Sequence, residues 1–154
     1  MSDFPETELH PLYTAGYTGL LPDDLLSAAQ HLGALIVDIR LNARSRVPYW
    51  NKGPLQRAWG EAYRHVGELG NLNYRSGGEV ALADEEKGVA QIVELLHQQP
   101  VILLCACVDW RTCHRRTAAE AVAARVGVAV THLSADDVRV LAGGNDLVEQ
   151  PPLL

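Results

Sequence analysis

Three cysteines and a histidine gather in one short segment of the chain. The segment opens with the apolar run 101–104 and continues through Cys105, Cys107, Cys113 and His114. A thiolate is a strong nucleophile and a soft metal ligand, and an imidazole can move protons near neutral pH. The segment therefore predicts a site for nucleophilic or acid–base chemistry, or a site for a metal ion.

The second half of this segment has the composition of a helix start. Residues 118–124 are rich in alanine, which favours a helix that begins close to Cys113. Unpaired amides and the helix dipole at such an end favour anions and lower the pKa of a thiol. We expect Cys113 to be a thiolate nucleophile, His114 to carry protons and Arg115 to bind an anion. The alternative is a packed cysteine beside surface arginines.

Cys105 is a second candidate nucleophile. It ends the apolar run, where cysteine often behaves as a small hydrophobic residue. However, Cys105 and Arg111 have the C-x5-R spacing of loops that cradle an oxyanion beside a thiolate. Catalysis by Cys105 and simple packing in the core both stay open at this point.

A metal site is an alternative use of the same residues. Cys105 and Cys107 are two positions apart, so on a strand they would face the same side. Together with Cys113 and His114 they could bind zinc or iron, because three thiols and an imidazole satisfy tetrahedral coordination. The spacing C-x-C-x5-C-H is not a familiar zinc pattern. No metal is therefore favoured, and the cofactor stays open.

A second segment, residues 39–60, is basic and contains no acidic residue. Arginine side chains bind phosphate or carboxylate groups through paired N–H donors. Long loops without their own secondary structure are usually functional. We expect a phosphate-bearing or nucleotide-like anionic small molecule to be bound by Arg40, Arg44, Arg46 and Arg115, with Tyr17 beside them.

Asp38 precedes this basic segment and has two interpretations. It could act as a general acid or base next to the cysteines. It could instead form a buried salt bridge with Arg40 or Arg115 that braces the loop. The sequence leaves both roles open.

The order of apolar runs and caps predicts a parallel α/β fold. Strands are expected at 12–16, 34–37, 101–105 and 128–133, and helices at 22–32, 54–66, 84–96, 113–125 and after Ser134. We predict a single-domain, three-layer α/β/α fold with a mostly parallel, open, Rossmann-like sheet over residues 1–154. Its core would span about 12–141, with flexible ends at 1–11 and 142–154. Ligands of such sheets bind beyond the carboxyl ends of the strands.

Composition limits the classes of function. The chain has 154 residues and a net charge of -6, which argues against broad, charge-driven binding of nucleic acid. We find no apolar run long enough to span a bilayer, so we expect no membrane partner. The odd number of cysteines suggests reduced thiols and a cytoplasmic location. The oligomeric state is not predicted.

Four short motifs carry a resemblance to a known family. They are Thr14-Ala15-Gly16-Tyr17, Asp38-Ile39-Arg40 with Arg44-Ser45-Arg46, Leu69-Gly70-Asn71, and Cys105-Ala106-Cys107 with Cys113-His114-Arg115. In combination they resemble the domain of unknown function 488 family. The resemblance implies an α/β fold and a shared pocket, but no reaction. Cys107 stands where the family usually has glutamate, and Asn71 replaces a glycine.

These observations lead to three hypotheses of function. The first is a small enzyme that acts on an anionic substrate through a cysteine. The second is a nucleic-acid or nucleotide-binding module without catalysis. The third is a Cys/His metal-binding protein. We favour the first, because the cysteine segment and the arginine segment should meet at one edge of the sheet.

Overall fold

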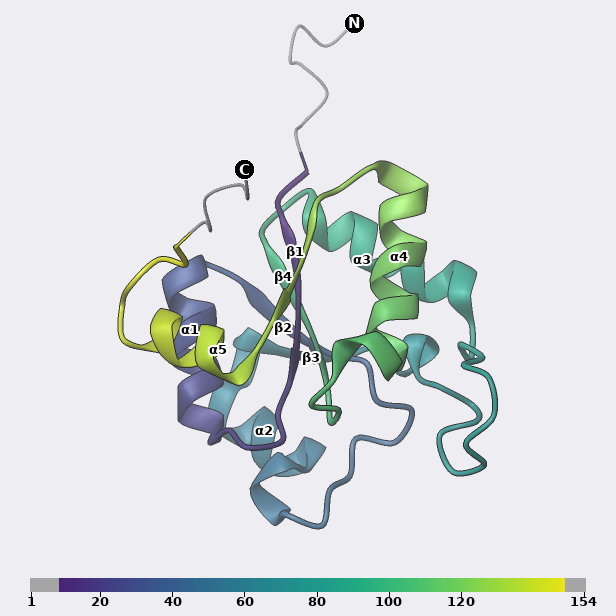
Figure 1. Ribbon diagram of the computed structural model, residues 1–154, viewed down its shortest axis with the longest axis horizontal. Coiled ribbons are helices and arrows are strands. Elements are labelled where there is room, and N and C mark those ends of the chain that lie inside the picture. Colours follow the sequence, from purple (N-terminus) through teal and green to yellow (C-terminus); the bar gives the residue numbers. More distant parts are fainter. Residues whose placement is uncertain (1–8, 149–154) are drawn as a thin grey trace, which may run out of the picture.

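The computed structural model describes residues 9–148 (Figure 1). The strands of this part are β1 (Leu12–Gly16), β2 (Leu35–Asp38), β3 (Tyr63–His65), β4 (Val101–Cys105) and β5 (Val130–Leu133). Its α-helices are α1 (Pro22–Leu32), α2 (Lys52–Trp59), α3 (Glu85–Leu96), α4 (His114–Val126) and α5 (Ala135–Ala142). Short 3-10 turns connect several of these elements.

The five strands form one parallel sheet in the order β3-β2-β4-β1-β5. Within it, Gly16 pairs with Cys105 and Asp38 pairs with Leu104, so the ends of three strands lie level with one another. In Figure 1 the strand ends and the loops that follow them lie toward the lower edge of the molecule. The predicted three-layer α/β fold with an open parallel sheet is confirmed.

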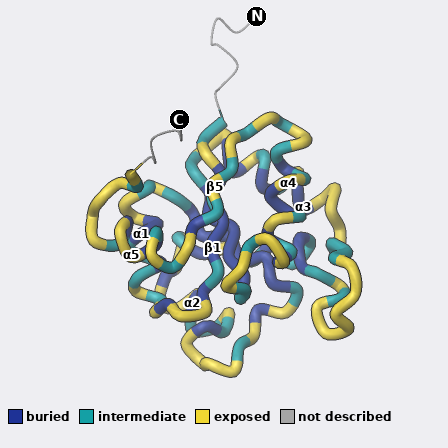
Figure 2. The backbone as a smooth tube through the Cα atoms, viewed as in Figure 1, coloured by how far each residue is buried: buried dark blue, intermediate teal, exposed yellow. Residues whose placement is uncertain are grey.

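Two apolar cores lie on opposite faces of the sheet. Strand β4 is buried throughout and alternates between them, as residues of a strand must. Val101, Leu103 and Cys105 pack with α3 and α4, whereas Ile102 and Leu104 pack with α1, α2 and α5. Figure 2 shows the buried residues along the central strands and the inner sides of the helices. This double burial holds the end of β4 in place.

Local signals in the sequence account for the helix boundaries. Pro22 opens α1 without losing a needed donor, and Gly33 ends it in the left-handed conformation at φ 66°. Ser134 and Asp137 form a capping box at the start of α5, with hydrogen bonds of 3.0 and 2.9 Å. Asp84 accepts a hydrogen bond from the amide of Lys87 at the start of α3.

The helix predicted at 54–66 is wrong in its second half. Helix α2 ends at Trp59, and Gly60 adopts a positive φ of 54°. The next residues form the edge strand β3, in which Tyr63 pairs with Ile36 of β2. Tyr63 and Val66 are buried, as the helical pattern required, but through pairing with β2. A strand of three residues is too short to show its own periodicity.

The ends of the chain are only partly described. Of the flexible ends predicted at 1–11 and 142–154, residues 1–8 and 149–154 lie outside the described residues. The described residues 145–148 have no regular secondary structure. Among the helices of residues 9–148, none combines the length and the apolar character needed to cross a membrane.

Candidate functional site

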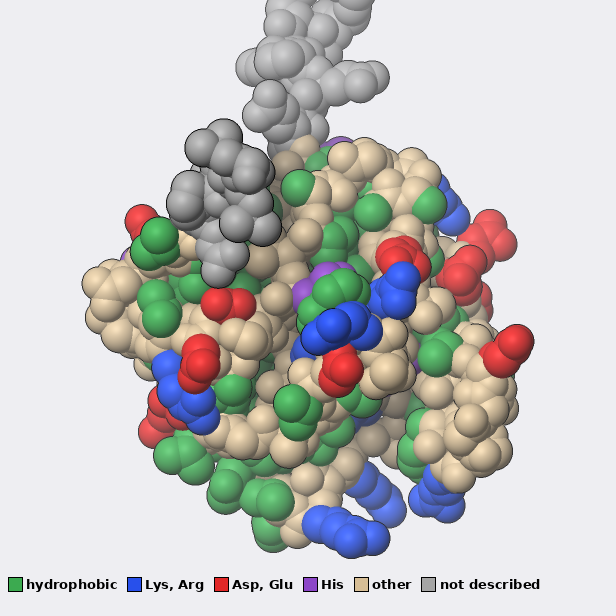
Figure 3. All heavy atoms as spheres, viewed as in Figure 1, with side chains coloured by type: hydrophobic (Ala, Val, Ile, Leu, Met, Phe, Trp, Pro, Cys, Tyr) green, Lys and Arg blue, Asp and Glu red, His purple; other side chains and the backbone are tan. Residues whose placement is uncertain are grey.

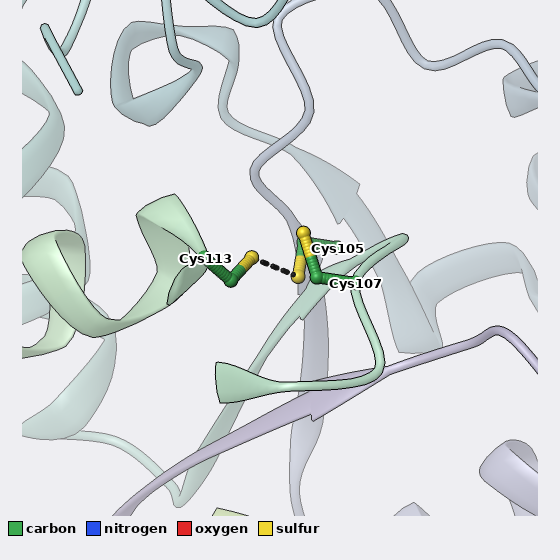
Figure 4. Close-up of side chains that lie close together, drawn as sticks. All are labelled: Cys105, Cys107 and Cys113. Carbon is green, nitrogen blue, oxygen red and sulfur yellow. Dashed lines mark hydrogen bonds between the residues drawn. The ribbon is translucent and has the colours of Figure 1, made fainter. Parts of the chain in front are cut away.

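The three cysteines meet at the carboxyl end of β4 (Figure 4). Cys105 is the last residue of the strand, Cys107 lies in the following loop, and Cys113 directly precedes α4. The sulfur atoms of Cys105 and Cys113 are 2.9 Å apart, and all three sulfur atoms lie within 4.8 Å of one another. The fold thus builds one thiol cluster from residues on both sides of the loop.

The three thiols differ in their access to solvent. Cys105 is fully buried and Cys113 is 3 % exposed, whereas Cys107 is half-buried. Cys107 lines a pocket of about 280 Å³, and the other two cysteines do not. The candidate nucleophiles Cys105 and Cys113 therefore lie behind Cys107, which the sequence had suggested only as a metal ligand. The position of Cys107 just after the apolar run was the sequence signal that it could be the accessible thiol.

The pocket lies beyond the strand ends, where parallel α/β sheets place their ligands. Its walls come from the loops after β1, β2 and β4, from the segment after residue 70 and from the start of α4. The lining residues are Tyr17, Arg40, Leu41, Asn42, Arg44, Asn71, Tyr74, Ala106, Cys107 and His114. Of the predicted site residues, Cys107, His114, Arg40, Arg44 and Tyr17 come together here.

Sequence reasoning missed Asn42 and Tyr74 as pocket residues. The side-chain amide of Asn42 donates to the hydroxyl of Tyr74 at 3.5 Å. This contact depends on the close approach of Gly70 to the backbone of Leu41, where a methyl group on Gly70 would overlap that backbone. The Leu69-Gly70-Asn71 motif was the signal, because a glycine often marks such an approach.

The cluster stabilises a thiolate at Cys107. Hydrogen bonding with the thiols of Cys105 and Cys113 lowers the pKa of Cys107, and the positive charge of Arg115 lowers it further. The same bonding to Cys107, together with burial, raises the pKa of Cys105. Of the three thiols, the one that faces the pocket is therefore the one most easily ionised.

His114 is held as a neutral imidazole. Its Nε2 atom lies 3.0 Å from the carbonyl oxygen of Ile39, to which it donates, and burial lowers the pKa of the ring. The Nδ1 atom then carries a lone pair and lies 3.8 Å from the sulfur of Cys113. His114 is thus oriented to accept a proton on Nδ1.

Arg115 lies beneath the loop and does not line the pocket. It is 1 % exposed, and its Nη2 atom donates to the carbonyl oxygen of Val108 at 3.3 Å. Its Nε and Nη1 atoms are buried and have no hydrogen-bond partner among residues 9–148. A methyl group on Gly16 would overlap the carbonyl oxygen of Cys107 and crowd Nη1 of Arg115. Arg115 therefore acts on the pocket through its charge.

Asp38 and Arg40 form a buried ion pair. Oδ2 of Asp38 lies 2.6 Å from Nη2 of Arg40, and Oδ1 accepts from Nε at 2.9 Å. The hydroxyl of Tyr63 donates to Oδ2 of Asp38 at 2.6 Å. Of the two interpretations of Asp38, the geometry shows the salt bridge, and the charge of Arg40 is largely balanced by it. Arg40 borders the pocket beside the ring of Tyr17.

Arg44 and Arg46 lie on the same loop, but only Arg44 reaches the Cys107 pocket. Arg44 lines the Cys107 pocket, whereas Arg46 lines a neighbouring hollow of about 600 Å³ together with Arg44, Tyr49 and Trp50. Lys and Arg side chains gather along the lower edge of the face in Figure 3. Arg44 is the arginine whose charge is best placed to meet an anion in the pocket.

The loop after β4 does not form the oxyanion cradle suggested by Cys105 and Arg111. The Arg111 side chain is exposed and contacts Asp109 at 3.3 Å. The amides of Arg111, Thr112 and Cys113 are bonded within the loop. The C-x5-R spacing therefore does not form an oxyanion-binding loop in this structure, because a 3-10 turn at Trp110–Thr112 directs Arg111 outward.

The thiol cluster could also hold a metal ion. Two thiolates on one tetrahedral zinc ion lie about 3.8 Å apart, given a zinc–sulfur distance near 2.3 Å. The Cys105 and Cys113 sulfurs, at 2.9 Å, would have to separate to accept such an ion. His114 could supply a nitrogen through Nδ1, because its other ring nitrogen is held by a carbonyl.

A family model covers the centre of this site. The model described as "Domain of unknown function DUF488" matches residues 73–122, which include α3, β4, the three cysteines and the first turns of α4. The chain resembles this family. The other three motifs lie before the matched residues. Comparison with curated proteins and with solved structures found no match.

Proposed function

We propose that the protein is a small enzyme that uses the thiolate of Cys107 on an anionic, phosphate-bearing substrate. One observation carries this proposal: Cys107 is the cysteine that lines the pocket, together with Arg44 and His114. The acidic thiol, the neutral imidazole and the arginine are the groups that such chemistry requires. A pocket of about 280 Å³ favours a small molecule over a nucleic acid.

The residues divide the work as follows. Arg44 binds the phosphate oxygens, and the Cys107 sulfur attacks phosphorus. An S–P bond forms as the bond to the leaving oxygen breaks, and that oxygen takes a proton from water. A second water then attacks phosphorus, its proton passes to Nδ1 of His114, and the thiolate leaves. Arg115 keeps Cys107 ionised from behind, and a cytoplasmic location keeps the thiols reduced.

A pair of alkylating reagents tests the site without knowledge of the substrate. Iodoacetate and iodoacetamide carry the same reactive group, but only iodoacetate is an anion. We expect the ratio of their rates at Cys107 to exceed that of a neutral cysteine peptide by about tenfold, which corresponds to 1.4 kcal/mol of anion attraction. Arg44→Gln should return the ratio to that of the peptide.

The matched control is Arg57→Gln, which removes an exposed arginine of α2 that does not line the pocket. This variant should keep the full ratio. Equal ratios for the protein and the peptide would contradict the anion site. Turnover is measured by phosphate release from p-nitrophenyl phosphate and other monoesters, and Cys107→Ser should lower any turnover by about 100-fold or more. Turnover that survives in Cys107→Ser would exclude the thiolate mechanism.

Metal binding is the second candidate function, favoured by the orientation of His114. The Nε2 bond to the Ile39 carbonyl is the arrangement that orients metal-bound imidazoles. Zinc or iron held by the three sulfurs and Nδ1 would be found at one equivalent in protein purified under reducing conditions. Folded protein without metal that fails to take up zinc would exclude this candidate.

A further inference from the structure

The thiol cluster contains more sulfur than a nucleophile needs. Cys107 faces the pocket, while Cys105 and Cys113 lie behind it with their sulfur atoms 2.9 Å apart. Neither buried thiol contacts the pocket, and one thiolate suffices for the proposed transfer reaction. The arrangement places an accessible sulfur next to a buried pair, which is what a relay of disulfide exchange requires.

We propose that the cluster is also a redox relay, in which Cys107 reacts with a hydroperoxide and the oxidation ends as a disulfide between Cys105 and Cys113. The proposal deepens the proposed function, since it rests on the same reactive Cys107. A hydroperoxide is the fitting oxidant because it is small enough for the pocket, and a low-molecular-weight thiol is the fitting reductant.

The first step oxidises Cys107. Its thiolate attacks one oxygen of the hydroperoxide, the O–O bond breaks, and the leaving alkoxide or hydroxide takes a proton from water. Sulfur loses two electrons and becomes a sulfenic acid. The pocket of about 280 Å³ admits the peroxide to Cys107 but not to the two thiols behind it.

The second step resolves the sulfenic acid. Cys113 lies across the loop from Cys107, with its sulfur within 4.8 Å. The Cys113 sulfur attacks that of Cys107, an S–S bond forms, and the hydroxyl leaves as water with the thiol proton. Bridging Cys105 to Cys107 instead would close a ring across a single residue. Cys113 is therefore the resolving residue.

The third step moves the disulfide inward. The sulfur of Cys105 lies 2.9 Å from that of Cys113, as Figure 4 shows by the dashed line. Cys105 attacks Cys113, the bond to Cys107 breaks, and Cys107 leaves as a thiolate while the Cys105 proton passes to water. Cys107 is the sulfur that leaves, because Cys105 attacks the Cys113 sulfur that lies 2.9 Å away. The oxidised protein keeps a free Cys107 and a buried disulfide.

Peptide mapping of the reduced, metal-free protein after one equivalent of hydrogen peroxide tests this relay. We expect a Cys105–Cys113 disulfide, reversed by an added thiol, and an alkylatable Cys107. Cys113→Ser should stop at a Cys107 sulfenic acid that dimedone traps, and Cys105→Ser should stop at a Cys107–Cys113 disulfide. Cys107→Ser should slow oxidation about tenfold or more, because the two remaining thiols are shielded.

The results separate the relay from the proposed function. Oxidation that stops at Cys107, with no disulfide in the wild-type protein, would overturn the relay while leaving the reactive thiolate in place. Equal oxidation rates in the wild-type protein and Cys107→Ser would also overturn it. An unreactive Cys107 toward both peroxide and iodoacetamide would overturn the relay and the proposed function together.

Discussion

The hydroxyl of Tyr63 donates a hydrogen bond of 2.6 Å to Oδ2 of Asp38, which joins the edge strand to the wall of the site. Asp38 is fully buried, and its carboxylate is also paired with Arg40. Arg40 in turn donates to the carbonyl oxygen of Trp50 at 2.7 Å. The chain of contacts runs from β3 through β2 to the arginine loop, and it holds that loop beside the pocket.

Removal of the Tyr63 hydroxyl should loosen this chain of contacts. Tyr63→Phe keeps the ring but leaves one lone pair of a buried carboxylate without its donor. We expect the free energy of unfolding to fall by about 1–3 kcal/mol, as for hydrogen bonds to charged groups. Urea denaturation measures the change. Tyr49→Phe, which alters an exposed tyrosine of the same loop, is the control and should leave stability nearly unchanged.

Loss of the Asp38 charge should cost more. Asp38→Asn leaves the buried guanidinium of Arg40 without its counterion, and we expect a loss of about 3–5 kcal/mol in the free energy of unfolding. The double variant Asp38→Asn with Arg40→Met should recover part of this loss, because no uncompensated charge is then buried. If the double variant loses more free energy of unfolding than the two single variants lose in total, the pairing is contradicted.

Gly16 should be intolerant of a side chain for a reason specific to the site. A methyl group there would overlap the carbonyl oxygen of Cys107, so Gly16→Ala must displace the loop that holds the reactive thiol. We expect iodoacetamide to alkylate Cys107 about tenfold more slowly in this variant, because its stabilising contacts are disturbed. Gly78→Ala, in the segment before α3, meets only ordinary contacts and should react like the wild-type protein.

Acid should weaken the fold through His114. Burial lowers the pKa of this imidazole, so the unfolded chain binds its proton first as the pH falls below about 6.5. The stability contributed by the neutral ring is present at neutral pH. It is lost as the pH falls below about 6.5 toward the lower pKa of the ring in the folded protein. We expect the wild-type protein to lose more free energy of unfolding between pH 7.5 and 5.5 than His114→Gln does. Equal losses would show that His114 carries no such linkage.

Most of the fold was predictable because its signals are local. The apolar run before Cys105, the proline and acids at the start of α1, and the capping box of α5 each act within a few residues. Strand β3 was not predictable, since its three residues are extended only because they pair with β2. The apolar residues of 54–66 also have helical spacing, and this spacing led to the wrong prediction of a helix there.

The site was predictable in its members more than in their roles. The cysteines, His114 and Arg44 were named from the sequence, because strand ends of a parallel sheet converge. The choice of Cys107 as the exposed thiol depends on the path of the loop over Gly16, which is a contact between distant segments. The burial of Arg115 and the position of Tyr74 in the pocket wall depend on similar contacts between distant segments. Such long-range packing leaves little trace in one sequence.

The pH dependence of Cys107 alkylation by iodoacetamide tests the central claim most directly. A free thiol has a pKa near 8.5, so its rate rises roughly 100-fold between pH 6 and 8. A lowered pKa keeps Cys107 ionised over this range, and its rate should change by less than about twofold. Mass spectrometry of the cysteine peptides reports each site. A rate at Cys107 that rises like that of a free thiol would contradict the account.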